Sequence, residues 1–189
     1  MTPAIRTRLL AATACSLLAA CASAPPAQVA TTTPASSSAR EAVAMLASAS
    51  GSLVSGKLVL VPMGDGVHVT GQVGGLKPGD IRGFHIHDKG DCSAADASSA
   101  GGHFNPAAQA HGRAGQGAHH AGDTDNLVAD ANGVARVDAH VRGVTLGGGA
   151  ANDIAGRAFI VHAAADDYAT QPTGNAGARV ACGVIRVVR

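Results

Sequence analysis

Apolar and polar residues alternate along several short stretches of this chain, which Gly, Pro and Asp separate from one another. The alternation is clearest at Val67-His68-Val69-Thr70, where both valines would face the same side of a strand. Residues 58–61, Leu-Val-Leu-Val, form a continuous apolar run instead, a pattern that a strand covered on both faces also shows. Stretches of these kinds predict strands at residues 41–49, 53–62, 67–73, 83–87, 134–141, 157–162 and 179–187.

These predicted strands indicate an all-β domain, because short strands with frequent turns between them are typical of sandwiches and barrels. No apolar stripe of helical period and helical length follows residue 40. Two long segments, 88–126 and 163–178, are rich in Gly, Ala and Asp and fit no strand. Loops of this length are uncommon in compact domains, and a metal or a disulfide is the usual means of ordering them.

Composition restricts both the core and the partners of the protein. The 189 residues include no Trp, one Tyr and three Phe, so Val, Ala, Leu and Ile must fill the core. The formal net charge is +1, and Lys and Arg form no run. These features argue against a nucleic-acid-binding protein, which would carry a basic patch or stripe.

The first 20 residues have the pattern of an export signal. Arg6 and Arg8 precede an apolar stretch at 9–20, which is too short to span a bilayer comfortably. The stretch ends in Leu-Ala-Ala before Cys21, which resembles the lipobox of bacterial lipoproteins. In that family the cysteine carries the lipid and becomes the new N-terminus. We therefore expect a lipoprotein signal peptide at 1–20 and membrane attachment through Cys21; the alternative is an ordinary secretory signal.

Residues 22–40 are rich in Ala, Pro, Ser and Thr and have no apolar period. Such a composition predicts a flexible tether at 21–40, followed by one domain at 41–189. A lipid-anchored, exported protein of this kind would lie in the periplasm of the bacterial cell envelope. Because Ala22 after Cys21 gives no signal for inner-membrane retention, we expect attachment to the outer membrane.

The four cysteines fall into two groups. Cys15 would leave with the signal peptide, and Cys21 would carry the lipid. Cys92 and Cys182 remain, and an exported protein lies where disulfides persist. One bridge between them would close a loop of about 90 residues and contribute about 4 kcal/mol in the chain-entropy model. The alternative is two buried free thiols.

Nine histidines are many for a chain of 189 residues. His85 and His87 lie two apart in a predicted strand, so their rings would point to one face and could share a ligand. His162 ends another predicted strand, where a single histidine is more often a core residue than a ligand.

The segment 88–126 contains a further series, which consists of His103, His111, His120 and Asp123. Three imidazoles and one carboxylate make a closed tetrahedral set that suits structural zinc. Zinc bound there would also explain how so long a loop is ordered. The alternative is a solvated polar loop with incidental histidines.

Several motifs together resemble those of the copper/zinc superoxide dismutases. They are G-F-H-I-H at 83–87, G-H-F-N-P at 102–106, H-A-G-D at 120–123, V-H at 161–162 and G-N-A-G-A-R-V-A-C-G-V-I at 174–185. The motifs occur in that family's order, and the resemblance covers residues 42–187. It implies an eight-stranded Greek-key β-sandwich or barrel with two long functional loops.

The resemblance also implies a role for each matching residue. The implied copper ligands are His85, His87, His103 and His162. The implied zinc ligands are His103, His111, His120 and Asp123, so that His103 is shared. Asp166 would link one histidine of each site, and Cys92 and Cys182 would form the family disulfide. Arg179 would stand beside the copper as a permanent cation for superoxide.

The implied activity is dismutation of superoxide to dioxygen and hydrogen peroxide, with one copper alternating between Cu(II) and Cu(I) and one zinc per chain. His103 would take up and return a proton during the cycle. The expected role is antioxidant defence, and a homodimer is left open. Between residues 163 and 185 Arg179 is the only cation, so the steering lysine of animal relatives is missing from this loop.

Three other functions are alternatives to this one. A relative that keeps the sandwich as a metal carrier or scaffold would not need all four copper positions and Arg179. A zinc-only structural lipoprotein stays open, because the sequence does not encode metal occupancy. A cupin would place Glu a few residues after the second His of its H-x-H motif, whereas D-K-G-D-C stands here at 88–92.

Overall fold

The computed structural model describes residues 36–189. The predicted signal peptide, Cys21 and most of the predicted tether lie outside this part of the chain. Among these residues, none of the helices has the length and hydropathy that a membrane span requires.

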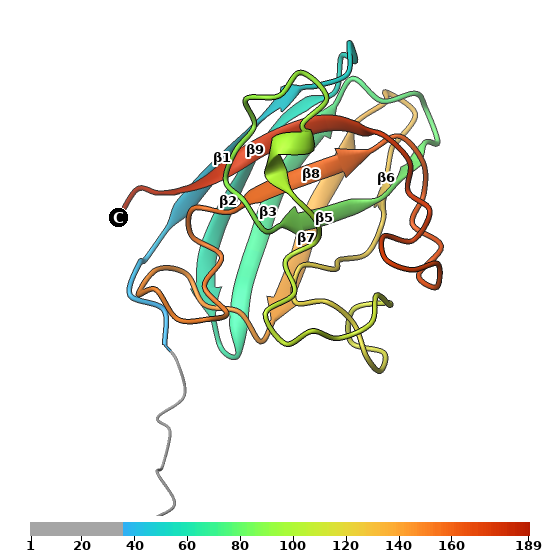
Figure 1. Cartoon of the computed structure of the whole chain (residues 1–189). Helices are drawn as coiled ribbons and strands as arrows, with labels where there is room; N and C mark the ends of the chain where they lie inside the picture. Colours follow the sequence, from blue (N-terminus) through green and yellow to red (C-terminus); the bar gives the residue numbers. More distant parts are fainter. Residues whose placement is uncertain (1–35) are drawn as a thin grey trace, which may run out of the picture. The chain divides into compact units, whose positions relative to one another are not determined.

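The described part is built almost entirely of strands (Figure 1). They are β1 (Ala42–Ser48), β2 (Ser55–Met63), β3 (Gly66–Gly74), β4 (Ile81–Arg82), β5 (Phe84–His87), β6 (Leu127–Val128), β7 (Ala135–Arg142), β8 (Ala158–His162) and β9 (Arg179–Val187). One 3-10 helix, η1 (Ser98–Ala100), lies in the loop after β5. Each predicted strand is present, with its ends displaced by at most two residues, and the sequence did not predict β4 and β6. Only Gly83 separates β4 from β5, so the two form one interrupted strand and the nine assigned strands correspond to the eight expected.

Seven strands form one antiparallel sheet in the order β5-β8-β9-β1-β2-β3-β7, and β4 pairs with β6. β1, β2 and β3 follow one another as neighbours, and the chain then crosses from β3 to β5 at the opposite edge of the sheet. It returns to place β7 beside β3. These crossings and the curl of the sheet visible in Figure 1 confirm the predicted all-β Greek-key fold.

Side-chain alternation along β2 and β3 produces the core. Val67 and Val69 are fully buried, whereas His68 between them is partly exposed, as the alternation predicts. In the apolar run of β2, Leu58 and Leu60 are fully buried, but Val59 and Val61 are only half-buried. One face of β2 therefore meets the core, and the second apolar face is only partly covered.

All three phenylalanines of the chain lie in the core, among many Val, Ala, Leu and Ile side chains. Phe84 of β5 stacks on Phe159 of β8, with ring centroids 4.8 Å apart and planes 9° apart. Phe104, in the loop after β5, is 1% exposed and lies under the guanidinium of Arg157, 3.6 Å from the ring centroid. Each aromatic ring thus packs directly beside a segment that carries histidines.

The last residues of the predicted tether lie against the domain. The Leu146 N–H donates to Ser37 Oγ at 2.8 Å, and the Ser38 and Ala39 N–H groups donate to the Leu146 carbonyl at 3.1 and 3.0 Å. The Arg40 N–H donates to the carbonyl of Arg189 at 2.6 Å. Contacts with the domain therefore begin a few residues before the predicted boundary at residue 41.

Candidate metal centre

β5 and β8 are neighbours in the sheet, and together they carry three buried histidines. His85 and His87 of β5 are fully buried, and His162 at the end of β8 is 3% exposed. The pairing of β8 with β9 shifts its register between Val161 and His162, an irregularity of the kind that redirects a side chain. His87 Nε2 and His162 Nε2 lie 3.4 Å apart.

His103 is the fourth member of this first group. It lies opposite His87 in an isolated bridge, and its ring centroid is 4.0 Å from that of His85. In the first group, one nitrogen from each ring lies within 4.8 Å of the others, and the members are His85, His87, His103 and His162. A copper ion could therefore be held by four imidazoles that come from two strands and one loop.

The loop after β5 supplies a second group, which meets the same distance limit and consists of His103, His111, His120 and Asp123. The Asp123 carboxylate lies at its centre, 2.8 Å from His103 Nδ1, 3.1 Å from His111 Nδ1 and 3.2 Å from His120 Nδ1. His103 thus turns Nδ1 toward this group, while its other ring nitrogen remains for the first group.

Three ring nitrogens of these groups are buried without a hydrogen-bond partner, namely His85 Nδ1, His103 Nε2 and His111 Nδ1. His111 Nδ1 is close to Asp123, but the contact lacks hydrogen-bond geometry. Buried polar atoms normally have partners, so three unpartnered nitrogens in one place indicate that they bind a ligand. Two metal ions would satisfy all three, and the residues present therefore fit copper and zinc.

Burial keeps the rings of the first group in the form that binds metal. It lowers the pKa of His87 to about 2 and the pKa of His162 to about 3. Burial also lowers the pKa of His85. Because a neutral imidazole is the form that ligates, these rings are ready for metal across the physiological pH range.

The carboxylate of the second group stays ionised. Burial works to raise the pKa of Asp123, but hydrogen bonds with His103 and with the His120 backbone N–H outweigh burial and hold this pKa well below its usual range. An ionised Asp123 supplies a negative charge to offset a divalent cation.

Asp166 lies between the two groups. The His85 Nε2–H donates to its Oδ2 at 2.7 Å, and the His111 Nε2–H donates to its Oδ1 at 2.9 Å. Burial works to raise the pKa of Asp166, but the hydrogen bonds from His85 and from the Tyr168 backbone N–H outweigh it, so the pKa is lowered. One buried carboxylate thus sets the ring orientation of a residue from each group.

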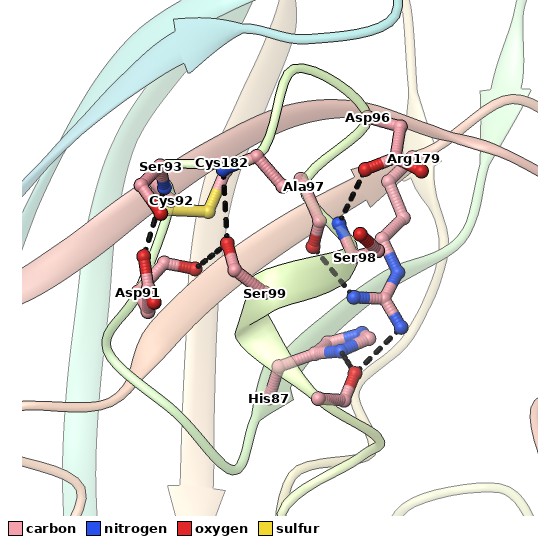
Figure 2. The surroundings of a disulfide bond; sticks show 12 residues. His87, Asp91, Cys92, Ser93, Asp96, Ala97, Ser98, Ser99, Arg179 and Cys182 are labelled. Atoms are coloured by element: carbon pink, nitrogen blue, oxygen red, sulfur yellow. Dashed lines mark hydrogen bonds between the residues drawn. A yellow bond between two sulfur atoms is a disulfide. The ribbon is translucent and has the colours of Figure 1, made fainter.

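Arg179, the first residue of β9, stands beside His87 of the first group (Figure 2). Its guanidinium donates to the carbonyls of Ala97 at 2.6 Å and Gly101 at 2.5 Å. The His87 Nδ1–H donates to the same Gly101 carbonyl at 2.8 Å. The Gly101 carbonyl therefore connects the cation directly to a potential copper ligand.

The segment that supplies these carbonyls is bonded covalently to β9. Cys92 and Cys182 form a disulfide with Cα atoms 5.8 Å apart, and the sulfur bridge is visible in Figure 2. The Ser99 hydroxyl donates to the Asp91 carbonyl at 2.9 Å and holds the same loop from within. The disulfide that the sequence predicted is therefore present.

Comparison with known proteins decides the family. A model of the copper/zinc superoxide dismutases matches residues 54–185, which is most of the described domain. The chain belongs to the copper/zinc superoxide dismutase family. Among named members of this family, it is 41% identical over 136 residues to superoxide dismutase [Cu-Zn] 2 of Aquifex aeolicus, covering 70% of this chain and 80% of that one. It is 44% identical over 139 residues to superoxide dismutase [Cu-Zn] 2 of Mesembryanthemum crystallinum, covering 70% of this chain and 86% of that one.

The fold of a solved relative agrees with this assignment to the superoxide dismutase family. A double mutant of a SOD-like protein from Bacillus subtilis superposes with a TM-score of 0.70 at 39% identity, covering 76% of this chain and 96% of that one. The copper and zinc expected from the sequence are the metals of this family, and the two histidine groups are able to hold them.

Several residues that the sequence did not point to support this superoxide dismutase site. Asn126 and Tyr168 contact Asp166, and Gln171 pairs with the backbone of His111 in both directions at 2.8 Å. Asn, Tyr and Gln seldom bind metals in proteins, and these three residues do not lie at the spacing of a metal-binding motif. The sequence offered one sign of Tyr168, the D-D-Y run at 166–168. An Asp side chain often accepts a hydrogen bond from the backbone N–H two residues later, which would place Tyr168 in a turn beside Asp166.

Proposed function

We propose that the protein dismutates superoxide in the bacterial cell envelope. The reaction consumes two superoxide ions and two protons, and it yields one dioxygen and one hydrogen peroxide. The observation that carries this proposal is the pair of buried ligand groups that share His103 and contain three ring nitrogens without partners.

The first group would hold copper and the second would hold zinc. Four imidazoles suit copper in both of its oxidation states, and three imidazoles with a carboxylate suit zinc. Copper bound there would supply one-electron redox chemistry, since it is stable as both Cu(II) and Cu(I). The remaining parts of the reaction, which are proton delivery and substrate placement, depend on the chain's own residues.

His103 is the residue placed to move a proton. Its Nδ1 faces Asp123 at 2.8 Å, and its Nε2 faces the first group without a hydrogen-bond partner. With Nδ1 held by the second group, Nε2 is the one position of the ring that can gain or lose a proton. We propose that Nε2 takes up a proton in one half of the cycle and delivers it to the reduced product in the other.

Arg179 would orient the substrate. Its two hydrogen bonds to the carbonyls of Ala97 and Gly101 fix the plane of the guanidinium beside His87. A guanidinium has five N–H donors, so further donors remain for a small anion. A fixed positive charge at this point would also raise the rate at which superoxide arrives.

A location in the cell envelope is supported by two features. The Cys92–Cys182 disulfide belongs to an oxidising compartment. The sequence Leu-Ala-Ala-Cys at 18–21 resembles a lipobox, so we propose that a lipid on Cys21 attaches the protein to the outer membrane. Replacing Cys21 with Ser in the producing bacterium should move the protein from the membrane fraction to the soluble periplasmic fraction. Unchanged membrane association of the Cys21→Ser variant would contradict the anchor.

The activity is tested by measuring metal content and superoxide decay on one purified sample of the domain. We expect about one copper and one zinc per chain, with fast decay that cyanide inhibits. His162→Ala, which changes the first group alone, should lose copper and activity while it keeps zinc. Zinc alone without superoxide decay, even after copper is added back, would mean a non-catalytic relative.

A further inference from the structure

A closed set of hydrogen bonds joins the two long loops directly behind the metal centre. Asp166 links His85 to His111, so the orientation of its carboxylate sets the orientation of both rings. The carboxylate can do so only if Asp166 is itself fixed. The side chain of Asn126 and both the backbone and the side chain of Tyr168 provide that restraint.

The amide of Asn126 pairs with the backbone of Asp166 in both directions. Asn126 Nδ2–H donates to the Asp166 carbonyl at 2.9 Å, and the Asp166 N–H donates to Asn126 Oδ1 at 2.8 Å. The two residues are 40 positions apart in the chain. Because Asn126 lies three residues after Asp123, this pairing connects the loop of the second ligand group to the loop after β8.

Tyr168 contacts both Asp166 and Asn126. Its backbone N–H donates to Asp166 Oδ1 at 2.7 Å, the same oxygen that accepts the hydrogen bond from His111. Its phenol oxygen accepts a hydrogen bond from the backbone N–H of Asn126 at 2.9 Å.

The φ angle of Tyr168 is 60°, in the left-handed region that bulky side chains rarely adopt. Such a conformation persists only where surrounding contacts hold it, and it is found most often at functional sites.

The ring of Tyr168 has an anchor that does not involve its hydroxyl. The guanidinium of Arg113 lies over the ring, 5.1 Å from its centroid, and Arg113 Nε–H donates to Asp125 Oδ1 at 2.9 Å. Replacing Tyr168 with Phe would therefore keep this packing and remove only the acceptor for the Asn126 N–H.

We propose that Tyr168 is a positioning residue of the metal centre, whose phenol oxygen and backbone N–H hold Asn126 and Asp166 in the arrangement that orients His85 and His111 for metal. The hydrogen bonds of Tyr168 reach Asn126 and Asp166 and no member of either ligand group, so it acts through these two neighbours. The inference rests on the metal-binding part of the function proposed above and does not depend on turnover.

The first test measures the zinc affinity of the metal-free protein by competition with a chromophoric chelator. Tyr168→Phe should weaken zinc binding about fivefold to tenfold, because one hydrogen bond behind a ligand is lost while the ligands remain. Asn126→Ala should weaken it further, since it removes both bonds to the Asp166 backbone.

Asn152→Ala is the matched control. Asn152 Nδ2–H also donates to a backbone carbonyl, that of Gly143 at 2.8 Å, but both residues lie in the connection between β7 and β8, and this hydrogen bond involves no member of either ligand group. We expect Asn152→Ala to lower the thermal midpoint of the metal-free protein and to leave its zinc affinity unchanged. A purely structural role for Tyr168 would give the same result as this control.

The chain carries its own spectroscopic probe for the second test. Tyr168 is the only tyrosine and no tryptophan is present, so tyrosine emission reports on this ring alone. Coupling between two sites is reciprocal, so zinc should in turn tighten the contacts of Tyr168. When zinc is titrated into the parent protein, the tyrosine emission should therefore change over the same range of zinc concentration in which chelator competition shows zinc to bind. The change should be lost in Asn126→Ala and kept in Asn152→Ala.

Zinc binding by Tyr168→Phe within about twofold of the parent would overturn the inference, because a single net hydrogen bond changes an equilibrium by more than that on average. An equal loss of zinc affinity in Asn152→Ala would also overturn it, because the effect would then be one of general stability. If the parent binds no zinc, the metal site proposed above fails first, and the inference fails with it.

Discussion

Removing the disulfide should affect both the stability of the domain and the placement of Arg179. The bridge joins residues 90 positions apart, and in the chain-entropy model a loop of that size contributes about 4 kcal/mol or slightly more at 25 °C. Single domains have a free energy of unfolding of only about 5–15 kcal/mol. Replacing Cys92 and Cys182 with Ala should therefore remove a large part of the stability of the metal-free protein.

The second effect of this double variant is local. Arg179 is anchored by the carbonyls of Ala97 and Gly101, and both belong to the loop that the bridge holds against β9. Without the bridge this loop can move, and we expect kcat/KM for superoxide to fall about tenfold or more at equal copper content.

Urea unfolding followed by far-ultraviolet circular dichroism measures how much the free energy of unfolding falls when the disulfide is removed. Parent and variant are compared without reductant and with chelator present, so that bound metal does not contribute. The parent treated with reductant should match the variant. A loss below about 1 kcal/mol would refute the loop-closure argument, because the model places the loss several-fold higher. Unchanged kcat/KM would refute the argument that the bridge places Arg179.

Two further predictions concern charge. Between pH 6.5 and about pH 3 the unfolded chain protonates His87 and His162, whereas the folded metal-free protein keeps them neutral. The unfolded state thus binds more protons, so the free energy of unfolding should fall as pH falls, by about 1.4 kcal/mol per pH unit for each ring. Urea titrations across this range test it, and a pH-independent midpoint would contradict it. Arg179→Gln should lower kcat/KM about tenfold while copper content stays constant, and the dependence of the rate on ionic strength should weaken. Full activity of Arg179→Gln at unchanged copper content would show that the guanidinium does not guide superoxide.

The longer strands were predictable from short apolar stretches between turn residues, which alternate in β3, as the burial of Val67 and Val69 reproduces, and run continuously in β2. β4 and β6 could not be predicted in this way, because a strand of two residues is too short to show any period. Their paired residues Ile81 and Val128 are also exposed, so burial in the core does not explain why they are apolar. Pairing between distant backbone segments defines these strands, and no local sequence pattern records it.

The candidate ligands could be named from the sequence because metal chemistry allows few residue types at constrained spacings. The supporting roles of Asn126 and Tyr168 could not be predicted, because each depends on contacts with backbone groups of a loop about 40 residues away. An asparagine and a tyrosine in polar segments have many ordinary explanations. Only the folded arrangement shows that both converge on Asp166.

β7 forms one edge of the seven-stranded sheet, and apart from a bridge between Ala129 and Ala135 the described residues place no strand along its outer side. An unpaired strand edge is a template on which another chain can add, and crowded proteins risk aggregating in this way. Along β7, Arg136, Asp138 and Arg142 alternate with buried residues and keep charge at the edge. A strand that added there would disturb these solvated charges. The domain should therefore stay dispersed even at the high surface density that the proposed lipid anchor would impose.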